Sequence, residues 1–130
     1  MTKNKILKED QSYTFGSYFQ LSYEPDDILA ELGYRFSQSR LLLPQGKRLP
    51  EQIPELRQRI ERTLPFVTLT SETARRETLV APILLEIATF CQCQLKFEYP
   101  LNVNRWLKGN LDYLLRSENN FLVVEAKHDE

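Results

Sequence analysis

Three charged residues near the end of the chain, Asp112, Glu125 and Lys127, are of the types that support phosphodiester hydrolysis. Two carboxylates at close range suit Mg²⁺, which prefers oxygen ligands and keeps several of its waters. A lysine beside them can orient an attacking water or stabilise the negative charge that develops on a phosphate. This chemistry requires the two carboxylates to meet, so the elements that carry them decide whether a site exists.

A β-hairpin would bring these residues together. Segments 111–116 and 121–127 are rich in leucine, β-branched and aromatic residues, which is typical of strands. The four polar residues 117–120 between them are turn formers. The pattern therefore predicts two antiparallel strands joined by a short loop.

The length of the loop fixes which residues face each other. With a loop of two or four residues, Arg116 pairs with Phe121, and stepping back along both strands pairs Asp112 with Glu125. Directly opposed residues have Cβ atoms about 4.5–5.5 Å apart. Side chains alternate between faces, so Lys127 shares a face with Glu125 and Asp112. A loop of odd length would slip the pairing by one residue and separate the carboxylates.

An ordinary hairpin with solvated edge charges is the alternative interpretation of these residues. Against it, Glu125 follows a run of four apolar residues, Phe121–Val124, which is typical of a strand buried on both faces. A charge in such a place is costly unless it is paired or bound to a metal. The run therefore favours a functional carboxylate at Glu125.

The pattern resembles the PD-(D/E)XK, or restriction-endonuclease-like, nuclease superfamily. Members carry an acidic residue on one strand and Glu-x-Lys or Asp-x-Lys on the next, which Asp112 and Glu125-Ala126-Lys127 match. Leu111 stands where the family has proline. The resemblance implies an endonuclease that hydrolyses phosphodiester bonds in DNA with Mg²⁺ or Mn²⁺. Asp112 and Glu125 would hold the metal with the Ala126 carbonyl, and Lys127 would serve catalysis.

A helix is predicted over about 72–91, beginning after Ser71 as its N-cap and bent at Pro82. Glu72 falls on the apolar stripe of this helix, which we expect to face the sheet. In the family that the chain resembles, the helix before the first core strand often supplies a metal-binding Glu. That role would fall on Glu72 first and Glu86 second. A favourable first-turn charge is the alternative for Glu72.

The order of predicted elements indicates an α+β fold. A strand over 94–103, in which Leu95, Phe97 and Tyr99 alternate with polar residues, precedes the hairpin and makes a three-stranded antiparallel sheet. With the helix before it, residues 71–130 resemble a partial restriction-endonuclease-like core, and residues 1–70 form an N-terminal extension.

Two short helices are predicted in that extension, over 25–32 and 54–64. The final helix and strand of the family core are missing from the sequence after Lys127. We therefore expect either that the chain is a fragment, or that its N-terminal half, a partner chain or a second copy in a homodimer covers the third strand, and the activity of the isolated chain depends on which.

The whole chain has a net charge of −1, so the only electrostatic sign of nucleic-acid binding is a locally basic region, residues 35–62. Within it, Arg57, Arg59 and Arg62 lie on the second predicted helix and could contact phosphates. A solvated helical face is the alternative. The corresponding alternative for the whole chain is a non-catalytic module that binds nucleic acid or protein.

Composition places the chain among soluble globular proteins of one domain, with 130 residues, 42% hydrophobic and 27% charged. It has no apolar run of membrane-spanning length and no signal peptide, so we expect a cytoplasmic protein without a membrane partner. Cys91 and Cys93, with a single histidine in the chain, make a poor zinc site.

Overall fold

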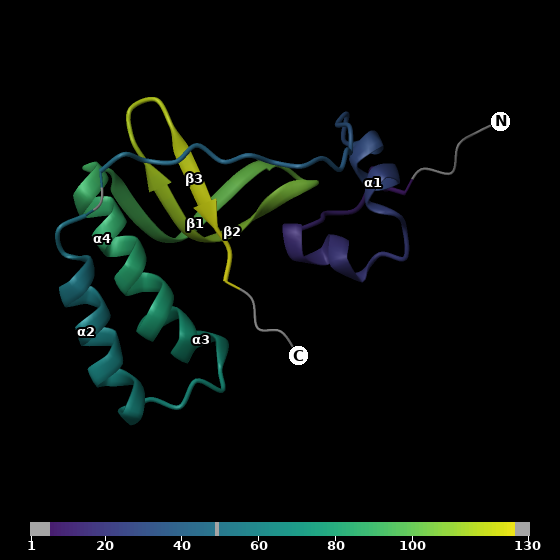
Figure 1. Ribbon diagram of the computed structural model, residues 1–130. Coiled ribbons are helices and arrows are strands. Elements are labelled where there is room, and N and C mark those ends of the chain that lie inside the picture. The colour runs from purple at the N-terminus through teal and green to yellow at the C-terminus, as the bar shows by residue number, and fades with distance from the viewer. Residues whose placement is uncertain (1–5, 49, 127–130) are drawn as a thin grey trace. The chain divides into compact units, whose positions relative to one another are not determined.

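The computed structural model describes residues 6–48 and 50–126 and has an α+β fold (Figure 1). Two compact units share the chain. One comprises the residues up to Pro44 together with Pro100–Asn110, and the other comprises Gln45–Tyr99 and the residues from Leu111 onward. The described candidate site residues all belong to the second unit. The division of the sequence into 1–70 and 71–130 stays a prediction.

The first unit contains the 3₁₀-helix η1 (Phe15–Gln20) and the helix α1 (Pro25–Glu31). Proline at the first position and two acidic residues in the first turn stabilise the start of α1. Gly33, with φ of 85°, follows the C-cap and permits the left-handed turn that ends the helix. The predicted helix over 25–32 is confirmed to within one residue.

The helices of the second unit are α2 (Ile53–Thr63), the 3₁₀-helix η2 (Leu64–Phe66), α3 (Glu72–Arg75), the π-helical η3 (Arg76–Val80) and α4 (Ala81–Cys91). The last three run on without a break, and α2 lies beside α4 (Figure 1). The Ser71 hydroxyl accepts a hydrogen bond from the Ala74 N–H at 3.0 Å, which confirms the predicted N-cap.

The irregularity predicted at Pro82 takes the form of the π-helical turn η3, immediately before the proline-containing turn of α4. Proline has no N–H to donate to a preceding carbonyl, and its ring crowds the turn before it. A widened turn relieves both effects, and such turns are frequent at functional sites. Arg76 is the first residue of this turn.

Strands β1 (Gln94–Asn104), β2 (Leu107–Arg116) and β3 (Phe121–Val124) form an open antiparallel sheet in the order β1-β2-β3. The predicted register is confirmed, since Arg116 pairs with Phe121 and Tyr113 with Val124. A backbone hydrogen bond from the Ser117 N–H to the Asn120 carbonyl, at 2.9 Å, closes the four-residue loop. β3 ends at Val124, before Glu125, and is therefore shorter than predicted.

The core of the second unit lies between α4 and β2. Leu84 and Ala88 of α4 pack with Tyr113 and Leu115 of β2, and the partly buried Val124 packs against them. Alternate residues of β2 thus face the helix, which fixes the orientation of the strand. This core positions the hairpin, and hence the candidate site at its end.

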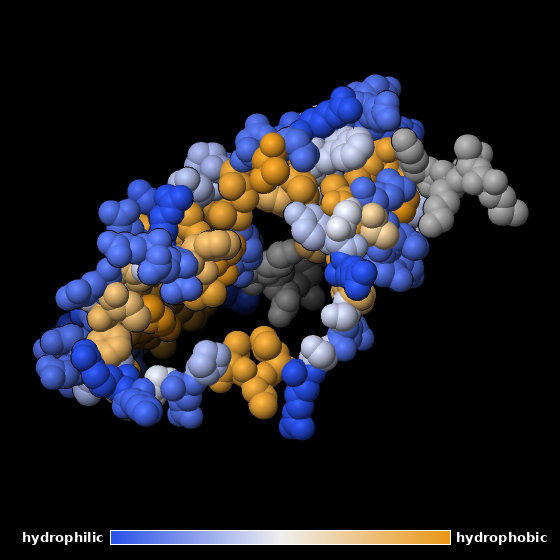
Figure 2. Space-filling view, turned by 90° about the horizontal axis from the view of Figure 1, so that it is seen from above, coloured by the Kyte–Doolittle hydropathy of each residue, from blue (hydrophilic) through white to orange (hydrophobic). Residues whose placement is uncertain are grey.

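Hydrophobic side chains also reach the surface, where Figure 2 shows them in orange among hydrophilic residues in blue. Among the most exposed of these side chains are Leu42, Phe66 and Phe121. Of the helices in residues 6–48 and 50–126, none has both the length and the apolar character that a membrane crossing requires.

Candidate functional site

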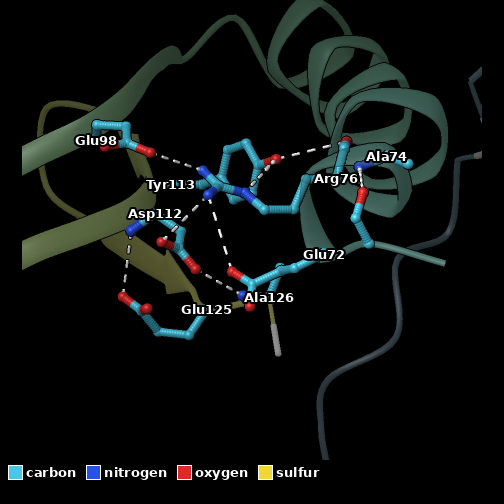
Figure 3. A network of polar contacts seen from close by, with 9 residues as sticks. Glu72, Ala74, Arg76, Glu98, Asp112, Tyr113, Glu125 and Ala126 are labelled. Carbon is cyan, nitrogen blue, oxygen red and sulfur yellow. Dashed lines mark hydrogen bonds and ion pairs between the residues drawn. The ribbon is translucent and has the colours of Figure 1, made fainter. Parts of the chain in front are cut away.

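Asp112 and Glu125 meet at the open end of the hairpin, as the register requires (Figure 3). The Asp112 N–H donates a hydrogen bond to Glu125 Oε1 at 3.3 Å, and the Ala126 N–H donates to Asp112 Oδ2 at 2.9 Å. Each acidic side chain therefore accepts a hydrogen bond from the backbone of the opposite segment. These contacts extend the hairpin one step beyond the backbone pairing, which ends at Val124.

Arg76 is the centre of the polar network around Asp112 (Figure 3). Its Nη1 lies 3.8 Å from Asp112 Oδ1 and 4.0 Å from Glu72 Oε1, so one guanidinium nitrogen serves both carboxylates. Its Nη2 lies 3.3 Å from Glu98 Oε1. Its Nε donates to the Tyr113 hydroxyl at 3.4 Å, and the guanidinium carbon lies 5.2 Å from the centroid of that ring.

Arg76 keeps its positive charge under all ordinary conditions. Its pKa is raised above the usual value, chiefly by the hydrogen bond with Tyr113, while burial lowers it and the charge of Asp112 raises it further. The side chain is only 17% exposed, so water screens its ion pair with the largely buried Asp112 only weakly. The guanidinium is thus a fixed internal counter-ion for Asp112.

The charges of this network do not balance. Glu72, Glu98 and Asp112 share the single guanidinium of Arg76, so these three carboxylates and one guanidinium leave two negative charges in excess. An excess of negative charge raises the local concentration of cations and opposes a phosphate group. The site can therefore attract a divalent cation more readily than a bare nucleic acid.

Local structure explains how three separate elements bring their side chains to the Arg76 network. Glu72 and Arg76 are four residues apart at the start of the helical stretch, so their side chains lie on one face. Glu98 has φ of 49°, a left-handed conformation inside the otherwise extended β1. Phe97 and Glu98 are both exposed as a result, so the alternation predicted for this strand is wrong at Phe97.

The structure brings some of the predicted site residues into contact with the network and leaves others apart. Glu72 is linked to Asp112 through Arg76 and does not join Asp112 and Glu125 in a group of three that could hold an ion, so its role as a metal ligand stays a prediction. Glu86 makes no contact with the network in the described part of the chain. Lys127 lies outside the described residues, so its predicted role stays a prediction.

Two further predictions concern residues away from the network. Arg57, Arg59 and Arg62 are exposed on α2, as a contact surface requires, and Arg57 Nε pairs with Glu61 Oε1 at 2.9 Å. Cys91 and Cys93 carry free thiols.

The donor set for a metal ion is small. Within residues 6–48 and 50–126, no three side chains of His, Cys, Asp or Glu are grouped so that they could hold an ion. Mg²⁺ is usually bound through one or two carboxylates, with waters and substrate phosphate oxygens completing its shell. The pair formed by Asp112 and Glu125 fits that mode of binding, and it does not fit a site made of protein ligands alone.

Three residues of the network were not anticipated from the sequence: Arg76, Glu98 and Tyr113. The sequence does contain a signal for Arg76. It lies four positions after Glu72, about 40° away on a helical wheel, and so falls on the stripe expected to face the sheet. No pattern in the sequence indicates the left-handed backbone at Glu98.

The chain matches no protein-family model, no curated protein and no solved structure. The case for a function therefore rests on the site itself.

Proposed function

We propose that the chain is a Mg²⁺- or Mn²⁺-dependent, endonuclease-like domain that hydrolyses phosphodiester bonds in DNA in the cytoplasm. Its sheet and helix would form a partial restriction-endonuclease-like core. The observation that supports this proposal is the meeting of Asp112 and Glu125 across the hairpin, in the register that the resemblance requires. Glu72, brought to the same guanidinium as Asp112, is the proposed accessory ligand.

Each residue of the candidate site has a definite task in this proposal. Asp112 and Glu125 bind the cation, and the backbone hydrogen bonds that they accept hold the two carboxylates in place. The bound ion would polarise a phosphoryl oxygen and lower the pKa of an attacking water. Lys127 would orient that water, and Arg76 partly neutralises Asp112 and Glu72 until the ion arrives.

The electrostatics of the site make the cation necessary. With two excess negative charges, the carboxylates around Arg76 repel a phosphodiester, whose own charge is negative. A divalent cation held by Asp112 and Glu125 would offset that excess and so would favour binding of a phosphate group. DNA binding at this site is therefore expected to require the metal, whereas binding elsewhere on the chain is not.

A divalent-metal titration tests the assignment of Asp112 and Glu125. Wild type is expected to bind Mn²⁺ in calorimetry, and Asp112→Asn and Glu125→Gln are each expected to weaken binding at least tenfold, because each removes one anionic ligand. Glu118→Gln, which removes the same charge from the hairpin loop, should leave the affinity unchanged. Equal binding by wild type and Glu125→Gln would show that the metal is held elsewhere.

A non-catalytic module that binds DNA is the second candidate, and Arg76 favours it. The guanidinium already neutralises part of the acidic network, and the backbone hydrogen bonds give Asp112 and Glu125 a structural task in ending the hairpin. In this case the exposed arginines of α2 would contact DNA phosphates, with no cleavage under any metal.

Plasmid cleavage separates the two candidates, and salt dependence tests whether the arginines of α2 contact DNA. Replacing Arg57, Arg59 and Arg62 together by Gln is expected to flatten the dependence of log affinity on log salt by about 0.9 for each phosphate that the variant no longer neutralises. Filter binding at two salt concentrations measures the slope. Glu125→Gln is the control, since it should keep the slope. Plasmid cleavage by wild type in Mg²⁺ or Mn²⁺ would exclude the non-catalytic candidate, and an unchanged slope would exclude the α2 surface.

A partner strand is also part of the proposal. Among the described strands β3 is an edge of the sheet, and Phe121 on it is 76% exposed. An apolar edge with unpaired backbone groups invites pairing with another strand. A second copy or a partner chain is therefore proposed to complete the sheet.

A further inference from the structure

A cavity of about 340 Å³ opens beside the Arg76 network in the second unit. Its volume lies near the lower end of the range typical of small-molecule sites, about 300–1,000 Å³. The side chains that give it chemical character are Thr73, Arg76, Glu77, Phe97, Glu98 and Tyr113. Arg76 lines this cavity and also contacts Asp112, so the cavity adjoins the proposed catalytic carboxylates.

Two aromatic rings form one side of the cavity. Tyr113 is only 2% exposed, and the guanidinium of Arg76 already covers its ring at 5.2 Å. Phe97 meets Tyr113 edge to face, with ring centroids 5.7 Å apart and planes at 69°. Phe97 is 51% exposed, so its ring is available to a ligand. A flat aromatic ligand could stack on Phe97 while Tyr113 supports that ring from behind.

The backbone at Glu98 brings Phe97 and Glu98 to the same cavity. A regular strand would direct these neighbours to opposite faces of the sheet. The left-handed conformation of Glu98, with φ of 49°, breaks that alternation. Such a conformation is strained in a residue other than glycine, and it is found preferentially at functional sites.

The polar groups of the cavity are of both signs. Glu77 and Glu98 can accept hydrogen bonds, while Arg76 and Thr73 can donate them. Within the described part of the chain, Glu77 makes no side-chain hydrogen bond or ion pair, so its carboxylate is available. An anion would be repelled by the two glutamates, and a ligand without hydrogen-bond donors would leave the carboxylate of Glu77 without a partner from the ligand. A neutral flat ring with donors and acceptors on its edge satisfies both.

We propose that this cavity binds one unstacked nucleobase of a single-stranded nucleic acid and selects bases that carry an exocyclic amine. Cytosine and adenine present that amine to Glu77, since Glu98 already pairs with Arg76, whereas thymine presents a carbonyl oxygen at the same position. The base stacks on Phe97. This inference rests on the proposed function, because the neighbouring phosphate would lie at Asp112 and Glu125.

Because the cavity takes an unstacked base, it is expected to prefer single strands to duplexes. In a duplex, the faces of a base are stacked on its neighbours and its Watson–Crick edge is paired. Extruding it costs a few kcal/mol, least where the base is already single-stranded. The same cavity in contact with duplex DNA would therefore bind weakly.

Fluorescence anisotropy with labelled 15-residue strands of dC, dT or a dC·dG duplex tests the inference, with the full chain in Ca²⁺ and separately in EDTA. Wild type in Ca²⁺ is expected to bind the dC strand at least fivefold more tightly than the dT strand or the duplex. Phe97→Leu should weaken binding of both single strands at least fivefold, because it removes stacking. Phe66→Leu, at another exposed aromatic ring, should not.

Glu77→Gln isolates base selection from general affinity. Its amide can donate as well as accept, so the preference for dC over dT should disappear while the dT strand binds at least as tightly as before. Equal binding of dC and dT by wild type, with Phe97→Leu indistinguishable from Phe66→Leu, would overturn the base subsite and leave the metal site standing. Selective binding that is the same in EDTA would support the subsite and count against the metal-dependent function. No binding of any strand would overturn the subsite. The Mn²⁺ titration would then test the proposed function independently.

Discussion

Arg76→Gln is expected to bind Mn²⁺ at least ten times more tightly than wild type, although the variant is less stable without metal. Nη1 of Arg76 lies 3.8 Å from Asp112 Oδ1 and 4.0 Å from Glu72 Oε1, where a divalent cation would compete with it. Two unit charges about 4 Å apart interact by about 4 kcal/mol near a protein surface. Water screens the exposed Glu72, yet even a third of that energy corresponds to a tenfold change in affinity.

The loss of stability has the same cause. Without the guanidinium, Asp112 is largely buried beside uncompensated carboxylates. Exposed ion pairs contribute about 0–1 kcal/mol, and breaking a fully buried pair costs about 3–5 kcal/mol, so a loss of about 2 kcal/mol is expected for this partly buried network. Thermal unfolding with and without Mn²⁺ measures both effects, because a ligand that binds the folded state raises Tm.

The controls separate charge from structure. Arg76→Lys keeps the charge and should bind Mn²⁺ nearly as weakly as wild type. Arg116→Gln removes one positive charge from an exposed position on β2, about 13 Å along the strand from Asp112, and should change neither property. Weaker Mn²⁺ binding by Arg76→Gln than by wild type would show that Arg76 only supports the structure of the site.

Tyr113→Ala is expected to destabilise the second unit by about 3–5 kcal/mol, the range typical of removing a buried aromatic ring. Tyr113 is among the most deeply buried side chains described, packs against Leu84 and Ala88 of α4, and supports Phe97 and Arg76. Since whole domains have a free energy of unfolding of about 5–15 kcal/mol, this variant should lose a large share of its stability and unfold at a markedly lower urea concentration.

Tyr113→Phe is the matched comparison. It keeps the buried ring and removes only the hydroxyl, which accepts from Arg76 Nε at 3.4 Å and donates to the Arg76 carbonyl at 3.5 Å. A loss of about 1 kcal/mol is expected, as for an ordinary hydrogen bond. Urea denaturation followed by circular dichroism gives both values. A cost below about 1 kcal/mol for Tyr113→Ala would contradict the central place of this ring in the core.

Local sequence patterns were sufficient for the elements that carry the candidate site. The helix over 72–91, its N-cap at Ser71 and the hairpin with its pairing of Arg116 and Phe121 all follow from interactions between residues close in the chain. The alternation of side chains along paired strands then places Asp112 beside Glu125 with no further information. The sequence could therefore specify two carboxylates at one point.

Only the tertiary structure decided what surrounds those carboxylates. Arg76 reaches Asp112 because packing of α4 on β2 brings the first turns of the helical stretch to the end of the hairpin, and periodicity alone does not define that contact. The left-handed residue Glu98 and the cavity beside it depend on contacts between residues far apart in the chain. Pairing of neighbouring strands is a local interaction, whereas the charge and shape of a site are sums over all the elements that meet there.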